Sequence, residues 1–297
     1  MRYCALFGVL LFVAGCSFFK PKQEIVPALK TLLDDIKLYK LEHPTTLHAG
    51  NLYEHLMWTH YAAARLFKEQ SPWVDQFPFS ERDKQLVMLA ALLHDVGKAG
   101  RIELFNGTHG KLTYTPVTDN SGKVIRILYG HDHKEHVLAG FEYVAEAFYP
   151  YGQQRQYILS RAIPFSLQPI FTQLKISLEE QKTIAVMVGM HYDFGMMVNR
   201  GMSNEEYISR LRQYAEKVQL PVLTEKILRM CVLVHVADLM ALNYVAPEPT
   251  WLFPHPEDYK AVRTIEPSAY ERFGYNTDKP LKVFNALLAC FHHLCNT

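Results

Sequence analysis

Residues 87–93 are apolar on every side of a helix and end in the adjacent pair His94-Asp95. A helix that is hydrophobic all round is buried inside a larger fold, so this segment predicts a central helix. Neighbouring side chains on a helix point about 100° apart. The carboxylate of Asp95 could therefore bridge two metal ions while the imidazole of His94 binds only one. Imidazole with carboxylate suits Fe, Mn, Zn, Ni or Mg.

Composition predicts a globular chain with a substantial core. Of its 297 residues, 49% are hydrophobic and 21% are charged, which favours one large folded domain. The net charge is +1 and the sequence contains no long basic run. It therefore shows no electrostatic footprint for a nucleic-acid partner.

Hydrophobic periodicity and capping signatures predict a mostly α fold. Ser80, Ser177 and Ser203 are each followed by an acidic residue three positions on, a pattern typical of helix N-termini. The helices after Ser177 and Ser203 are expected to run to about His191 and Val218. Apolar spacing predicts further helices over 25–41, 52–67, 134–148, 224–243 and 281–294.

One segment has the pattern of strands. Residues 111–117 and 123–129 are rich in β-branched and aromatic residues and flank a turn sequence at 118–122, which predicts a β-hairpin inserted at 111–129. The hairpin lies just before His131, so it is either a lid or substrate contact, or a structural addition without a role at the site.

The order and spacing of the acidic and histidine residues resemble the HD superfamily of metal-dependent phosphohydrolases. The family pattern of His, His-Asp, His, His and Asp is matched by His55, His94-Asp95, His131, His191 and Asp238. The resemblance implies an HD-domain helical bundle, here over residues 47–245. It also implies a phosphohydrolase that acts on a phosphomonoester or phosphodiester, expected to be a phosphorylated small molecule or a nucleotide-like substrate.

The same resemblance gives each residue a role. A first divalent ion would be held by His55, His94, Asp95 and Asp238, and a second by His131 and His191, with Asp95 bridging. Two such ions about 3.5–4 Å apart could hold an activated hydroxide and clamp the attacking and leaving oxygens. Lys98 lies one turn from the His-Asp pair and could reach a phosphate, which makes Asp95 and Lys98 the candidate catalytic residues. Otherwise Lys98 is a solvated lysine at a helix end.

Some positions stay open. His133 and His136 stand close to His131, which is preferred because Gly130-His131-Asp132 resembles a motif of the family. Asp132 and His133 are candidates for protonating a leaving oxygen. His235 shares a helix face with Asp238, and a core partner is favoured over a spare ligand.

The first residues resemble the signal of a bacterial lipoprotein. Arg2 precedes an apolar run at 4–14, and Val13-Ala14-Gly15-Cys16 resembles a lipobox. We expect a signal peptide over 1–15, lipidation at Cys16, a tether and helix over 16–46, and residence at the periplasmic face of an outer membrane. The alternatives are an uncleaved anchor or a cytoplasmic protein. Residues 246–297 are expected to form a C-terminal loop and helix.

Two rival functions remain open. Di-iron oxygenases that resemble myo-inositol oxygenase use the same ligand set, so ligand identity does not separate them from phosphohydrolases. A non-catalytic domain that keeps the metal site for structure is the second rival.

Overall fold

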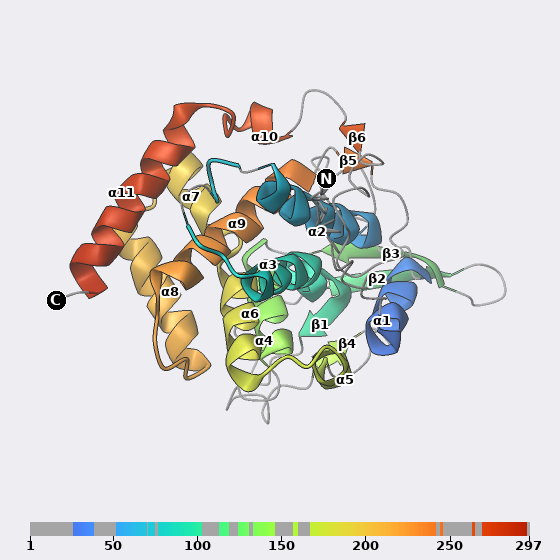
Figure 1. Cartoon of the computed structure of the whole chain (residues 1–297). Coiled ribbons are helices and arrows are strands. Elements are labelled where there is room, and N and C mark those ends of the chain that lie inside the picture. Colours follow the sequence, from blue (N-terminus) through green and yellow to red (C-terminus); the bar gives the residue numbers. More distant parts are fainter. Residues whose placement is uncertain are drawn as a thin grey trace, which may run out of the picture.

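Helix α3 (Glu81–Leu93) lies at the centre of the fold, as its all-round apolar sequence predicts. Every residue from Leu86 to Leu93 is buried. In the computed structural model, α2 (Leu52–Lys68), α6 (Leu178–Met190) and α9 (Glu225–Ala241) pack around it, as Figure 1 shows. The mostly helical fold expected from the sequence is confirmed.

The structure describes residues 26–38, 52–69, 71–74, 77–102, 113–118, 124–130, 133–145, 157–159, 167–241, 244–245, 263–264 and 269–295. Within these ranges the remaining helices are α1 (Pro27–Leu38), α4 (His133–Val144), α5 (Gln168–Gln173), α7 (Asp193–Arg200), α8 (Asn204–Lys217), α10 (Ala269–Arg272) and α11 (Asp278–Cys295), with a 3₁₀ turn at Val96–Ala99. The sequence pattern predicts a helix that ends near His191 and does not indicate the separate helix α7 that follows it.

The three predicted N-caps are present. Ser80 and Ser177 each accept a hydrogen bond from the backbone N–H three residues on, and the carboxylates of Asp83 and Glu180 accept one from the backbone N–H of the cap residue, which completes a capping box in each case. Ser203 caps α8 by accepting a hydrogen bond from the backbone N–H of Glu206. These bonds satisfy amide groups that the first turn of a helix leaves without a partner.

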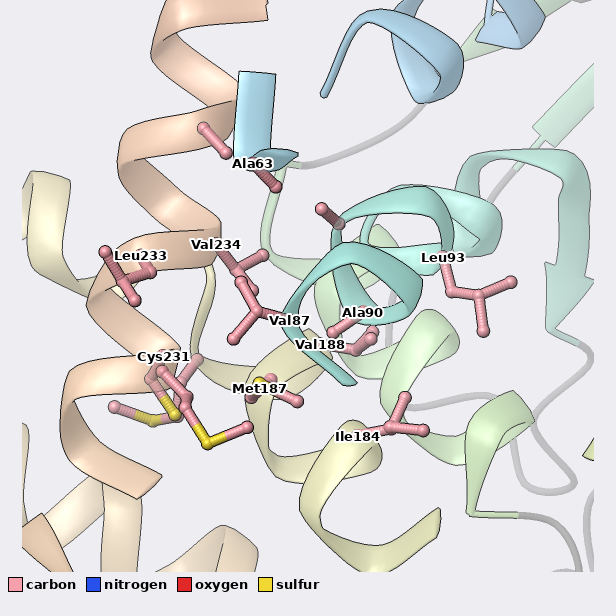
Figure 2. Close-up of a cluster of buried hydrophobic side chains, with 14 of the residues drawn as sticks. Ala63, Val87, Ala90, Leu93, Ile184, Met187, Val188, Cys231, Leu233 and Val234 are labelled. Carbon is pink, nitrogen blue, oxygen red and sulfur yellow. The ribbon is translucent and has the colours of Figure 1, made fainter. Parts of the chain in front are cut away.

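The core between α3, α6 and α9 is almost entirely aliphatic. Figure 2 shows Val87 and Ala90 of α3 facing Met187 of α6 and Val234 of α9. Ala63 of α2 lies at the edge of the same cluster. These side chains are fully buried, and burial of this kind contributes about 25 cal/mol per Å² of apolar surface.

Helices α3 and α6 run in the same direction. At their starts, the Arg82 guanidinium donates from Nε and Nη2 to the two carboxylate oxygens of Glu180, at 2.6 and 2.8 Å. At their ends, the rings of His94 and His191 lie 5.0 Å apart. The ion pair therefore fixes the ends of the two helices that lie away from the histidines.

The described strands form small antiparallel pairs. Within the segment predicted as a hairpin, β2 (Thr113–Thr118) pairs with β3 (Val124–Gly130), with Thr113 opposite Gly130. The other pairs join β1 (Gly100–Ile102) to β4 (Tyr157–Leu159) and β5 (Tyr244–Val245) to β6 (Arg263–Thr264). A role of the hairpin as a lid stays a prediction.

The C-terminal helix packs on the bundle. Helix α11 contacts α7, α8 and α9, along the side of the molecule away from α1 (Figure 1). Pro280 lies in its first turn, as expected. Within the described part of the chain, no helix is both long and apolar enough to span a membrane. The lipobox at Cys16 lies outside the described residues.

Candidate metal centre

Five of the residues singled out from the sequence meet at one place inside the bundle. His55 comes from α2, Asp238 from α9, His94 and Asp95 from the turn after α3, and His191 from the end of α6. The side chains of His55, His94, Asp95 and His191 are almost completely buried, whereas that of Asp238 is 18% exposed. Asp238 is therefore the most exposed of the five side chains.

One group of donor atoms gathers around His55. Its Nε2 lies 3.0 Å from Nε2 of His94, 3.2 Å from Oδ2 of Asp95 and 3.2 Å from Oδ1 of Asp238. His94 Nε2 is 3.4 Å from the same Asp95 oxygen and 3.5 Å from the same Asp238 oxygen. Ligands about 2.0–2.2 Å from a shared divalent ion would themselves be separated by about 3.0–3.5 Å. The observed distances fit such an ion.

A second group gathers around the other oxygen of Asp95. Its Oδ1 lies 3.2 Å from Nε2 of His136 and 3.6 Å from Nε2 of His191. Ligand atoms of His94, Asp95 and His191 all lie within 4.8 Å of one another, as do those of His55, His94 and Asp238. The two oxygens of Asp95 thus face two different pairs of histidines.

Hydrogen bonds to the backbone fix which ring nitrogens face the centre. Nδ1 of His94 lies 2.7 Å from the carbonyl oxygen of Ala91, and Nδ1 of His191 lies 2.7 Å from that of Val188. A carbonyl oxygen only accepts, so each Nδ1 carries a hydrogen and each Nε2 is the nitrogen that would offer its lone pair to a metal. The close approach of the His55 and His94 nitrogens then calls for a cation or a proton between them. The donor set therefore fits a divalent metal.

Electrostatics keeps two of the imidazoles neutral. Burial and the charge of Lys98 lower the pKa of His136 to about 3, and burial with His94 lowers the pKa of His191 to about 4. Both imidazoles are neutral at pH 7, as metal binding requires. Burial opposes the charged form of His94, but the carboxylates of Asp95 and Asp238 raise its pKa to about 10. A metal ion would replace that proton.

Lys98 is buried rather than solvated. Its side chain is 6% exposed and its ammonium forms an ion pair with Oδ2 of Asp95. The alternative of a solvated lysine at the helix end is therefore wrong. The contact places a positive charge directly beside the carboxylate that faces both histidine pairs.

His136 is the site residue that the sequence analysis did not select. His131, chosen for the second ion, lies outside the described residues, as does Asp132, and the side chain of His133 is not described. Among the described histidines, His136 occupies the position beside His191. One residue in the sequence could have indicated His136. Gly140 lies one turn after it, and the backbone of Gly140 packs closely against Gly97.

His235 is a core partner, as the sequence analysis favoured. Its Nδ1 lies 2.7 Å from the carbonyl oxygen of His191 and its Nε2 lies 2.8 Å from the hydroxyl of Tyr275. Both ring nitrogens are thereby used away from the centre, so His235 is not a spare ligand.

Comparison with known proteins gives one match. The family model described as HD domain matches residues 52–238, which is more than half of the chain and runs from the first residue of α2 to Asp238 itself. No curated protein matches the chain, and no solved structure does.

Proposed function

The chain belongs to the HD-domain family, and on that premise we propose that it is a metal-dependent phosphohydrolase that uses two divalent ions. Its substrate is a phosphomonoester or phosphodiester of a nucleotide-like molecule. The observation that carries the proposal is the division of the Asp95 carboxylate, one oxygen toward His55 and His94 and the other toward His136 and His191.

Each protein group then has a defined task. His55, His94 and Asp238 would hold one ion, His136 and His191 the other, and Asp95 both. Bound ions of this kind lower the pKa of water and stabilise charge on phosphoryl oxygens. The ammonium of Lys98 pairs with Asp95 and would orient a phosphate oxygen. The imidazoles are buried, and among the described site residues the side chain of Asp238 is the most exposed, at 18%.

The decisive experiment is a metal analysis of protein purified without chelator, followed by a hydrolysis screen. Substrates are p-nitrophenyl phosphate, bis-p-nitrophenyl phosphate and a set of nucleotides, each with Mn²⁺, Ni²⁺, Mg²⁺, Fe²⁺ or Zn²⁺. We expect hydrolysis that EDTA abolishes and added metal restores. Bound iron with oxygen consumption on a cyclitol, and no hydrolysis, would instead identify an oxygenase like myo-inositol oxygenase.

The proposal includes a location. The apolar run at 4–14 followed by Val13-Ala14-Gly15-Cys16 supports export and lipidation at Cys16. The domain of 47–245 would then work on the periplasmic face of an outer membrane, on phosphate esters present there rather than on cytoplasmic nucleotide pools.

A further inference from the structure

The carbonyl group of His191 is held by a side chain from another helix. His191 is the C-cap residue of α6, and the last carbonyls of a helix have no partner within the helix. Nδ1 of His235, on α9, lies 2.7 Å from this carbonyl oxygen. The bond ties the end of α6 to the helix that carries Asp238.

The direction of the hydrogen bonds at His235 follows from its two partners. Because the carbonyl oxygen of His191 only accepts, Nδ1 of His235 carries the hydrogen and Nε2 is an acceptor. Tyr275 lies with its hydroxyl oxygen 2.8 Å from Nε2, so the Tyr275 hydroxyl donates. A directed chain therefore runs from Tyr275 through His235 to the backbone of His191.

Close packing against helix α7 restricts the position of the His235 ring. A β-carbon on Gly195 of α7 would lie 2.7 Å from Cε1 and 3.2 Å from Nε2 of the ring, so a side chain there would displace it. The Phe194 ring stands edge-on to the imidazole, with centroids 5.9 Å apart. The orientation of the His235 ring that allows its hydrogen bond to the His191 carbonyl is thus also the one that its packing against Gly195 and Phe194 requires.

Tyr275 belongs to a part of the chain beyond the family match at 52–238. Its amide donates to the carbonyl of Tyr270 at 2.8 Å, and Gly274 supplies the left-handed residue of this turn, with φ of 73°. The hydroxyl of Tyr270 accepts a hydrogen bond from Nε1 of Trp73 at 2.9 Å. Two tyrosines of one turn therefore fasten it to the domain at different points.

We propose that Tyr275 and His235 are positioning residues of the metal centre, and that their hydrogen-bond chain sets the affinity for the ion that His191, His136 and Asp95 would hold. The inference rests on the metal site of the proposed function, but not on its substrate. Residues 269–275 then contribute to metal binding, although they lie outside the matched domain.

The test is a titration of metal-free full-length protein with Mn²⁺ and Co²⁺, with calorimetry for affinity and the visible Co²⁺ spectrum for ligand geometry. Tyr275→Phe removes one hydroxyl and keeps the ring. We expect the affinity for one of the two ions to fall about 10-fold, the lower end of the loss for groups that orient a metal ligand, with a changed Co²⁺ spectrum.

Tyr270→Phe is the matched control, because it removes a hydroxyl from the same turn that bonds Trp73 instead of His235. It should leave the metal affinities and the Co²⁺ spectrum at wild-type values while thermal unfolding reports the stability of both variants. His235→Leu should weaken the same ion, and His235→Asn, which retains an N–H near the Nδ1 position, should restore part of the affinity.

Equal affinities and spectra in Tyr275→Phe and wild type would overturn the inference, as would equal losses in both tyrosine variants. Wild-type protein that binds metal without hydrolysing phosphate esters would contradict the proposed substrate class alone, and the comparison of the tyrosine variants would still decide this inference. Wild-type protein that binds neither ion overturns both.

Discussion

Gly97 and Gly140 pack backbone against backbone. A β-carbon on Gly97 would lie 2.4 Å from the amide nitrogen of Gly140 and 2.2 Å from the carbonyl oxygen of His136. Only glycine fits at 97 without moving α4. Because α4 carries His136, this contact sets the distance between His136 and Asp95, and so the size of the second half of the centre.

Gly97→Ala should therefore act on metal binding as well as on stability. Displacement of α4 would remove His136 from Asp95, and we expect the bound metal to fall from two ions to one per chain. Overpacking of this kind costs about 1–3 kcal/mol. Metal content by mass spectrometry and urea unfolding of the metal-free protein measure the two effects.

Gly201→Ala is a suitable control for that loss of stability. Gly201 has φ of 75° and nothing within 4 Å of an added β-carbon, so alanine strains only the local backbone, at a cost of about 1 kcal/mol. It should leave both ions bound. One ion fewer in this variant would mean that metal content follows stability rather than the position of α4.

Asp95→Ala should abolish metal binding and hydrolysis together, because it removes the carboxylate whose two oxygens face the two halves of the centre. Asp193→Asn is the control: Asp193 is also a buried carboxylate, but it pairs with Arg210 at 3.0 Å. That variant should keep its metal. Two ions retained in Asp95→Ala would refute the bridging arrangement.

Lys98→Met should separate metal binding from turnover. The ammonium is not a metal ligand, so metal content should equal or exceed that of wild type once the charge beside Asp95 is removed. Turnover should fall about 10²-fold, the scale of losing one electrostatic stabiliser of the transition state. Steady-state kinetics with p-nitrophenyl phosphate and metal analysis of the same sample measure both.

Lys182→Met provides the comparison for a buried lysine elsewhere. Its ammonium donates to the carbonyl of Gln219 at 2.9 Å, away from the centre. We expect lower stability with unchanged turnover per folded molecule. Unchanged kinetics in Lys98→Met would confine Lys98 to a structural ion pair.

The Arg82–Glu180 pair should make stability depend on pH in acid. The hydrogen bonds from Arg82 hold the pKa of Glu180 at about 2, although its partial burial acts in the opposite direction. The ordinary pKa of a glutamate is about 4.3, so the stabilisation is complete above that pH and is lost as pH falls towards 2. Urea midpoints of Glu180→Gln should lie below those of wild type at pH 7 and converge with them near pH 2.

Glu81→Gln tests whether the effect is specific to that pair. Glu81 forms a surface pair with Lys84, and its side chain is 67% exposed. Exposed pairs contribute little, so its midpoints should follow those of wild type throughout. A gap for Glu180→Gln that stays constant with pH would show that its charge is not what stabilises the fold.

Cys16→Ser tests the proposed location. With the native leader, wild type should fractionate with membranes and carry a lipidated N-terminus at Cys16, whereas the variant should not be lipidated. Fractionation and the mass of the mature N-terminus decide this. If both proteins keep Met1 and remain outside the membrane fraction, a cytoplasmic phosphohydrolase is the better description.

The parts of the fold that sequence predicts best are those that depend on local chemistry. The caps Ser80, Ser177 and Ser203 and the buried character of α3 follow from residues within one helix. His136 and Tyr275 depend instead on contacts between segments far apart in the chain. Gly97 makes room for α4, and the turn at 270–275 brings a hydroxyl to His235. Neither of these contacts produces a periodic pattern in the sequence from which it could be predicted.

Helices α3 and α6 orient their terminal histidines in the same way. Each has 13 residues, begins with a serine capping box and ends in a histidine whose Nδ1 bonds the carbonyl three residues back. Since these bonds are made within each helix, they form when the helix forms and need no ion to direct them. The rings of His94 and His191 can thus be oriented by the protein alone, before a metal binds.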